Sequence, residues 1–486
     1  MNWWVLKRPI HISWLIATVS LSLLLGVWLA QYVSGLSGLT AVWLITVSVT
    51  VILLGLWRRK LYILPLVIIG GLGFGLVRGA GSQAELSQYD SLIGSIHQLS
   101  GTVREDIDTN ARGITTIRLN EITIDDRAYS GSLWVTTRSD REMLRGDRII
   151  IEGKISSGFG SFAASVYNAD VAIVERPQPG DIARIVRDWF AGGVRQVLPE
   201  TEASLGLGYL LGQKRGLPPE LEVALQVVGL THIVVASGYN LTILVRLARR
   251  LFEKASKYLA ALSAGTMIVG FMAITGLSPS MSRAGLVAGL SLLAWYYGRR
   301  FHPLVLLPFA AAVTVMINPS YAWGDLGWQL SFAAFAGVLI LAPLLHAYFF
   351  GDSKPGFVGQ VLIETFSALV VTAPLLIVSF GQLATLALVA NMLVLPLVPL
   401  AMLLTFVAGI AAFIIPAWAV IIGAPAQWLL GYMIYVVHTL AGVPWATVTI
   451  ELPVWTLAIM YGILILLCVY LQRVTRYDLG RVNIVE

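Results

Sequence analysis

Long apolar segments separated by short polar loops fill two stretches of the chain, residues 1–79 and 203–472. About 20 apolar residues suffice for a helix to cross the hydrocarbon core of a bilayer. The pattern predicts a polytopic α-helical membrane protein of about twelve spans, some of them broken or re-entrant. We expect these spans at residues 10–33, 39–56, 61–79, 229–247, 258–277, 283–298, 303–317, 326–348, 357–380, 383–414, 417–440 and 454–472.

Residues 80–178, between the two apolar stretches, alternate apolar and polar positions with a period of two. The alternating runs are rich in Val, Ile and Thr and are separated by Gly, Asp and Asn, as is typical of short antiparallel strands. They occupy 98–107, 114–124, 130–138, 147–156 and 169–175. Five strands predict a small inserted β domain, either an OB-like barrel or a plain meander.

The period changes to that of a helix in residues 179–202. Ile182, Ile185 and Trp189 fall on one face, and Arg184 and Arg187 fall elsewhere. This segregation favours an amphipathic helix that lies in the membrane interface. A connector packed on the β domain is the alternative.

Composition and charge support the membrane assignment and indicate its orientation. The chain has 486 residues, of which 57% are hydrophobic and 12% charged, so a water-soluble globule is excluded. Its excess positive charge lies outside residues 80–200 and gathers at the ends of spans, where cytoplasmic loops carry Lys and Arg. This rule places both termini, including the tail 473–486, in the cytoplasm and the β domain outside it.

Known catalytic and metal-binding patterns are absent from the sequence. The six histidines have no HxxE or HxH spacing, and no GxxxxGK[ST] loop is present to hold a nucleotide phosphate. Ser237 lacks the GxSxG context of an esterase nucleophile. We therefore expect no enzymatic activity, no metal and no cofactor.

Polar residues inside the apolar segments are the informative ones, because such groups are costly in hydrocarbon and mark bundle interiors or wet paths. A charged turn at Lys214 and Arg215 indicates a re-entrant or interfacial hairpin, and residues 237–240 interrupt the following span. A broken helix is tolerated where protein or a water-filled cavity receives its backbone. Alternatively, Ser237 and Asn240 only bond neighbouring helices.

Three further clusters follow along the chain. Arg283 begins a span and either lines an entrance or extends to the interface. Asp325 precedes a helix that it can cap, whereas Gln329 and Ser331 lie deeper and are candidates for contacts between helices. Asn391 is the lone amide of a proline-containing apolar run, which indicates a kinked, pore-lining helix.

Together the clusters resemble the membrane domain of the ComEC-type competence DNA channels. The order of motifs is LLGQKRGLPPELEVALQVVGLTHIVVASGYNL, SPSMSRAGL, NPSYAWGDLGWQLSF and SFGQLATLALVANMLVLP, over residues 204–400. The family also has an OB-like domain outside the membrane after a few short spans. Residues 203–472 would then form the competence-type channel domain.

This resemblance implies a bacterial inner-membrane channel that passes single-stranded DNA into the cytoplasm. The residues that it suggests for the DNA path are Lys214, Arg215, His232, Ser237, Gly238, Asn240, Arg283, Asp325, Gln329, Ser331 and Asn391. In the β domain, Arg104, Arg112, Arg118 and Arg127 form either a DNA-contacting stripe or a solvated face. The implied partners are the DNA strand, the lipid bilayer, a DNA receptor and a cytoplasmic ATPase motor.

Two departures from the family limit what the resemblance implies. Tyr239 and Asn240 stand where the family usually has a His, so no role of that His is carried over. The HxHxDH motif of the family's nuclease domain is absent, so we expect strand degradation to be supplied by a separate nuclease or omitted.

Two other functions fit the sequence. A secondary transporter for a small anionic or amphiphilic solute would also use broken helices, and internal inverted repeats would favour it. An envelope scaffold whose β domain binds a partner would instead tolerate polar substitutions in the membrane.

Overall fold

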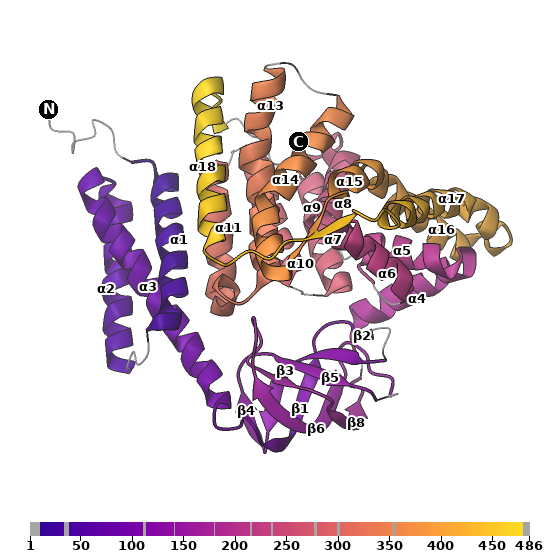
Figure 1. Ribbon diagram of the computed structural model, residues 1–486, viewed down its shortest axis with the longest axis horizontal. Helices are drawn as coiled ribbons and strands as arrows, with labels where there is room; N and C mark the ends of the chain where they lie inside the picture. Colours follow the sequence, from indigo (N-terminus) through magenta and orange to yellow (C-terminus); the bar gives the residue numbers. More distant parts are fainter. Residues whose placement is uncertain are drawn as a thin grey trace. The chain divides into compact units, whose positions relative to one another are not determined.

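The computed structural model describes residues 10–33, 38–109, 113–139, 141–178, 180–213, 216–234, 237–276, 279–298, 302–351, 353 and 356–479. They fall into two compact units (Figure 1). Unit 1 contains the described residues within 1–109, 113–178 and 301–332, and unit 2 contains those within 179–300 and 333–486.

The helices divide between the units. Unit 1 has α1 (Ile12–Leu29), α2 (Gly38–Arg58), α3 (Leu64–Leu86), α11 (Pro303–Ile317) and most of α12 (Leu326–Ala336). Unit 2 has α4 (Ile182–Val197), α5 (Glu200–Leu211), α6 (Pro219–Val227), α7 (Thr231–Val234), α8 (Gly238–Glu253), α9 (Lys257–Thr275), α10 (Pro279–Tyr296), α13 (Ala342–Phe350), α14 (Phe357–Phe380), α15 (Ala387–Val394), α16 (Val398–Ile414), α17 (Pro416–Ala441) and α18 (Thr456–Thr475).

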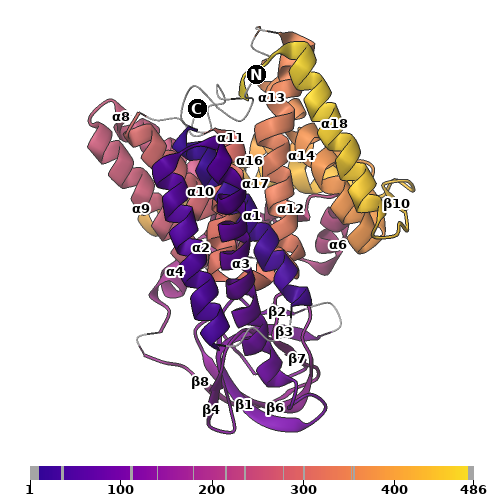
Figure 2. The same cartoon turned by 90° about the vertical axis from the view of Figure 1, so that its left-hand side faces the viewer.

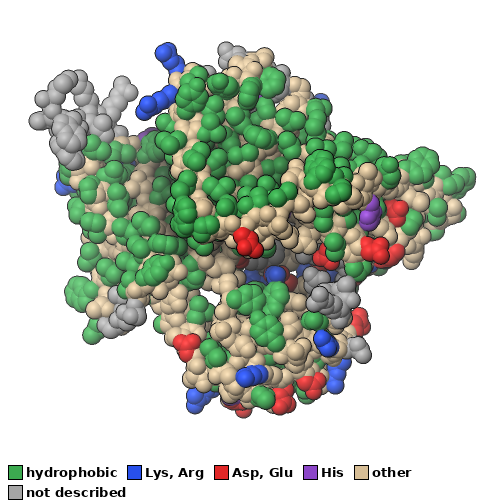
Figure 3. Space-filling model, in the orientation of Figure 1, with side chains coloured by type: hydrophobic (Ala, Val, Ile, Leu, Met, Phe, Trp, Pro, Cys, Tyr) green, Lys and Arg blue, Asp and Glu red, His purple; other side chains and the backbone are tan. Residues whose placement is uncertain are grey.

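Nine helical stretches among the described residues are long and apolar enough to cross a membrane. They are Ile12–Tyr32, Gly38–Arg58, Leu61–Tyr89, Lys257–Thr275, Leu326–Phe350, Val358–Phe380, Ala387–Ile414, Pro416–Ala441 and Thr456–Thr475. Each coincides with a predicted span; the other three predicted spans contain α8, α10 and α11, which are shorter or less apolar. Hydrophobic side chains cover the helical surface in view (Figure 3). The predicted fold, a polytopic membrane protein with an inserted β domain, is confirmed.

Glycine lets α1 and α3 pack with their backbones in contact. A Cβ atom on Gly26 of α1 would lie 2.3 Å from the carbonyl oxygen of Leu72. One on Gly75 of α3 would lie 2.2 Å from the carbonyl oxygen of Leu23. Small residues drive such approaches in membranes, where lipid removes the hydrophobic advantage of helix association. Figure 2 shows the resulting bundle of α1, α2 and α3.

The β domain is a closed barrel. Its strands are β1 (Ile96–Val103), β2 (Asp108–Thr109), β3 (Thr115–Ile124), β4 (Arg127–Tyr129), β5 (Leu133–Thr137), β6 (Arg148–Ser157), β7 (Ala164–Val166) and β8 (Asp170–Glu175). The sheet order is β1-β3-β5-β7-β6-β8, and β1 also pairs with β6, which closes a five-stranded ring. The pair β5–β7 is parallel, and the other pairs are antiparallel. This closure favours the OB-like barrel over the open meander.

The alternating pattern explains the barrel. Residues at every second position of β3 and β5 are buried, and these residues fill a core shared with β1 and β6. All five predicted strands are present; β2, β4 and β7 were not predicted. Tyr89, just after α3, is buried in this core and donates a hydrogen bond to the Ser130 carbonyl at 3.1 Å. The barrel is thereby anchored to α3.

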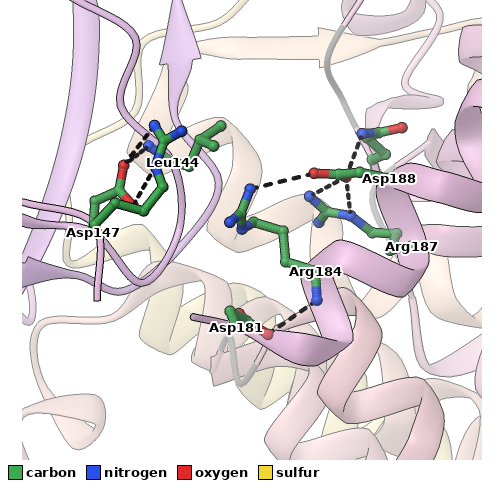
Figure 4. A network of polar contacts seen from close by, with 8 residues as sticks. Leu144, Asp147, Asp181, Arg184, Arg187 and Asp188 are labelled. Carbon is green, nitrogen blue, oxygen red and sulfur yellow. Dashed lines mark hydrogen bonds and ion pairs between the residues drawn. The ribbon is translucent and has the colours of Figure 1, made fainter. Parts of the chain in front are cut away.

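A carboxylate fixes the turn that precedes β6. Asp147 accepts a hydrogen bond from the Leu144 amide at 2.9 Å and two from the Arg176 guanidinium at 3.2 Å each (Figure 4). The hydrogen bonds with Asp147 raise the pKa of Arg176 above its ordinary value. The pair ties the end of β8 to the β6 turn.

A second contact joins the barrel to the segment before α12. A Cβ atom on Gly324 would lie 2.0 Å from the carbonyl oxygen of Gly160, in the loop between β6 and β7. No side chain fits between these backbones. The β6–β7 loop is therefore held against the turn that leads into α12.

Gly324→Ala is expected to destabilise unit 1, because overpacking of this kind costs about 1–3 kcal/mol. The purified variant should show a lower thermal unfolding midpoint and faster proteolysis in the barrel. The matched control is Gly81→Ala on α3, where an added Cβ atom meets nothing within 4 Å. An unchanged midpoint for Gly324→Ala would contradict this close contact.

Candidate functional site

The predicted helix interruption is present in unit 2. Helix α7 ends at Val234 and α8 begins at Gly238, with Ser237 at its N-cap. The Ser237 hydroxyl accepts a weak hydrogen bond from the Asn240 amide nitrogen at 3.5 Å and donates to Asn240 Oδ1 at 3.3 Å. Because Ser, Thr, Asp and Asn side chains satisfy free amides at helix starts, Ser237 explains why a new helix begins here.

Asn240 connects this helix start to α5. Its side chain is 0% exposed, and Nδ2 donates to the carbonyl oxygen of Tyr209 at 3.0 Å. Tyr209 lies in the last turn of α5, where carbonyl groups have no donor within their own helix. Asn240 supplies the missing donor from another helix.

Helix α10 meets the same helix start. A Cβ atom on Gly238 would lie 3.2 Å from Cβ of Ala284. The preceding residue, Arg283, is only 4% exposed. Arg283 thus lies inside unit 2. Its side chain does not extend to the surface, as the second alternative from the sequence had it.

Helix α4 is amphipathic, with its apolar face outward. Ile182 and Trp189 are 64% and 61% exposed, whereas Arg184 and Arg187 are buried, Arg187 to 1%. A surface of this kind is stable against lipid rather than water. The predicted interfacial helix fits this arrangement, with its charges directed into the protein.

The buried charges of α4 share one carboxylate (Figure 4). Asp188 Oδ1 accepts from Arg187 Nε at 3.0 Å, and Asp188 Oδ2 lies 3.7 Å from Arg184 Nη1. Gln213, just after α5, donates to Asp188 Oδ1 at 3.3 Å. Three donor groups around one carboxylate fix α4 to the end of α5.

Gln213 also accepts a hydrogen bond from Arg195 Nη2 at 3.4 Å, and Arg195 pairs with Glu200 at 3.2 Å. On the other side of the predicted charged turn, Gly216 has a φ of +85°, which favours glycine. Lys214 and Arg215 themselves lie outside the described residues. Gln213, which precedes them, is held by its contacts with Arg195 and Asp188.

Two other predicted residues of unit 2 lie on different elements. His232 is exposed on α7. Asn391 is buried on α15, where Nδ2 donates to the Ala387 carbonyl at 2.8 Å and Oδ1 has no hydrogen-bond partner among the described residues. A buried acceptor without a donor is uncommon, because most buried polar groups are hydrogen-bonded.

The remaining predicted path residues belong to unit 1. Asp325 caps α12, because its Oδ1 accepts from the Trp328 amide at 2.6 Å. Gln329 and Ser331 are half-buried on the same helix. The contacts of Asp188 with Gln213 and of Asn240 with Tyr209 are made within unit 2.

In the barrel, the four predicted arginines take different positions. Arg118 pairs with Glu105 at 2.5 Å, and Arg104 lies beside it, with its amide bonded to the Arg118 carbonyl. Arg127, on β4, is exposed, and its cross-strand neighbour on β3 is Ile124. Ile124 lies six residues after Arg118 on the same strand, so Arg127 is about 20 Å from Arg118. Arg112 lies outside the described residues.

Sequence reasoning missed an aromatic cluster on the outer face of the barrel. Trp134 of β5 is the cross-strand partner of Arg118, whose guanidinium lies 5.6 Å from the Trp134 ring. Phe159 and Phe162 pack edge-on against Trp134 at 5.5 and 5.2 Å. Trp134 occupies an outward position in the alternating pattern of β5, and this position was the one sequence signal for the cluster. Phe159 and Phe162 lie in a Gly-rich loop, where no periodic pattern indicates which way a side chain points.

Comparison with known proteins gives one family and two relatives. Residues 209–474 match the family model described as Competence protein. An "Uncharacterized protein" of Aquifex aeolicus is 25% identical over 263 residues, which are 53% of this chain and 59% of that protein. The "ComE operon protein 3" of Bacillus subtilis is 26% identical over 222 residues, 44% of this chain and 27% of that protein. This chain therefore spans less than two thirds of either relative, and no solved structure matches it.

Asn240→Leu is expected to destabilise unit 2 by about 1–3 kcal/mol, because the Tyr209 carbonyl would lose its donor in a buried place. The thermal unfolding midpoint of the purified protein measures the loss. Thr242→Val is the matched control, since the Thr242 hydroxyl bonds only the Gly238 carbonyl of its own helix. Equal midpoints for the two variants would show that the α5–α8 bond contributes nothing.

Proposed function

Because this chain belongs to the competence protein family, we propose that it forms the path by which single-stranded DNA crosses the inner membrane during natural transformation. In this proposal both termini lie in the cytoplasm and the barrel lies outside it. The family assignment rests on a match over more than half of the chain, and one relative carries a competence-type name, ComE operon protein 3.

The sign of the buried charge in unit 2 is the observation that carries the proposal. Among its described residues, the buried charged side chains are Arg184, Arg187, Arg249 and Arg283, and no carboxylate is buried. Each arginine inside a membrane domain is costly, by at least about 2.5–3.5 kcal/mol on insertion scales. Keeping Arg184, Arg187 and Arg283 is explained if a polyanion occupies the interior for part of the cycle.

Three of these arginines are the proposed phosphate contacts. Arg184 and Arg187 lie beside Gln213 and Asp188, and Arg283 precedes Ala284, which packs against Gly238. Guanidinium groups bind phosphate through paired N–H donors. In the proposal they contact successive phosphates, Ser237 and Asn240 shape the broken helix, and Lys214 and Arg215 extend the basic surface.

The barrel would contribute a stacking surface. Single-strand binding by OB-type barrels combines a basic groove with aromatic rings on which bases stack. Trp134, Phe159 and Phe162 supply the rings and Arg118 the cation. Phe159 is exposed and offers the first free ring face.

The proposal leaves the energy and the removal of the second strand to other proteins. The chain has no nucleotide-binding loop and no nuclease motif. A cytoplasmic ATPase motor, a DNA receptor and a separate nuclease are therefore the proposed partners.

Arg283→Gln is expected to lower uptake of labelled DNA about tenfold or more, because a charge-assisted contact with phosphate is lost. The measurement is transformation and internalised label in a deletion strain complemented at matched membrane levels. Arg473→Gln, at an exposed position of α18, is the control with the same charge change and should transform normally. Unimpaired uptake in the complete deletion would overturn the proposed function. Flux of small anions, but not of DNA, through the reconstituted protein would instead favour the secondary transporter.

Trp134→Ala is expected to weaken binding of a single-stranded oligonucleotide by the full-length protein about fivefold or more, since stacking of one base contributes about 1–3 kcal/mol. Fluorescence anisotropy in detergent gives the affinity. The control Tyr167→Ala removes an exposed barrel aromatic outside the cluster. Equal affinities of Trp134→Ala and the unaltered protein would exclude the stacking role while leaving the membrane path untouched.

A further inference from the structure

The fourth buried arginine of unit 2, Arg249, lies in a different cluster, formed by the end of α8, the start of α9 and the end of α10. Its guanidinium carbon lies 5.2 Å from the Trp295 ring centre. The Lys257 ammonium lies 5.7 Å from the same ring and 5.6 Å from that of Tyr296. Two cations therefore converge on adjacent aromatic rings of α10.

Arg249 is buried without full compensation. Its side chain is 7% exposed, and its nearest carboxylate, Glu253 of the same helix, lies 4.0 Å from Nε. Nε and Nη1 have no hydrogen-bond partner among the described residues. Donors left unpaired in a buried place cost free energy that an anionic acceptor would recover.

The charged groups around this cluster are mostly basic. Arg250, Lys254 and Lys257 are exposed at the end of α8 and the start of α9, and Glu253 is the one acidic residue between positions 246 and 257. Glu364 of α14 interacts electrostatically with Arg246, one turn before Arg249. The net charge of this stretch is therefore positive, which favours an anion.

The cluster adjoins a surface that suits acyl chains. Leu251 on α8 and Leu262 on α9 are exposed, and so is Tyr258 next to Lys257. Basic residues beside aromatic rings and exposed aliphatic side chains are the composition found at headgroup depth. A nucleic acid would expose these aliphatic side chains to water, whereas a lipid covers them.

We propose that the α8–α9–α10 cluster binds the phosphate headgroup of an anionic phospholipid, with Arg249 and Lys257 as its cationic ligands and the acyl chains on the adjacent apolar surface. The site is separate from the proposed DNA path, so either can fail without the other. Its role would be to hold the ends of three helices together in an anionic leaflet.

The test measures lipid binding by the full-length protein in detergent, by thermal unfolding and native mass spectrometry. Dioleoyl-phosphatidylglycerol should raise the unfolding midpoint and stay bound, and dioleoyl-phosphatidylcholine should do neither. Arg249→Gln should weaken phosphatidylglycerol binding about tenfold or more, because several charge-assisted hydrogen bonds are lost. Lys257→Gln, which keeps the buried guanidinium, should weaken it about fivefold and serves if the first variant fails to fold.

Arg250→Gln is the matched control, with the same charge change one residue away at an exposed position. A loss as large as that of Arg249→Gln would reduce the effect to general surface charge and overturn the site. Stabilisation by phosphatidylglycerol that is unchanged in both Arg249→Gln and Lys257→Gln would also overturn it. Equal stabilisation by inorganic phosphate, or by a short single-stranded oligonucleotide, would assign the site to an anion other than lipid.

Discussion

Direct contact between helix backbones at glycine is the constraint on which the membrane part of this protein depends. In lipid, apolar side chains gain little by packing on one another, so association relies on close approach and van der Waals contact. Gly26 and Gly75 provide this approach in unit 1. In unit 2, a Cβ atom on Gly337 would lie 2.5 Å from the Ser367 carbonyl oxygen, and one on Gly208 would lie 2.9 Å from that of Val234. Larger residues at these places would separate the helices and expose the polar groups between them.

Aromatic contacts with α16 decide which face of α4 is buried. Gly409 of α16 lies against the Phe190 ring, and Trp189 stacks on Phe413 at 4.1 Å. These contacts hold α4 in one orientation along α16, and its arginines consequently point inward to Asp188 and Gln213. Apolar packing thus sets the position of Asp188 and of the groups that contact it.

Period and composition were enough to predict the nine long apolar helices among the described residues and the five main strands, because each depends on residues close together in sequence. Pairings between distant segments were not predictable. The short strand β7 closes the barrel, and β9 (Gln382–Ala384) pairs with β10 (Thr447–Thr449) across more than 60 residues. Helix α4 was recognisable as amphipathic, but its pattern does not tell which face turns outward. The partner of Asn240 likewise could not be predicted, because Tyr209 lies on another helix, 31 residues away.

The outward apolar face of α4 has a consequence for how the chain is made. A segment with three arginines and an aspartate cannot enter the bilayer alone during synthesis, since each central charge opposes insertion by about 2.5–3.5 kcal/mol. Its charged groups are paired by Glu200 and hydrogen-bonded by Gln213 from the region of α5, and its rings pack on α16, which is synthesised some 200 residues later. The partners of these rings are therefore made only after the helices between α4 and α16 have been synthesised. In unit 2, the helix that stands first in the sequence would then reach its final position only once α16 has followed it.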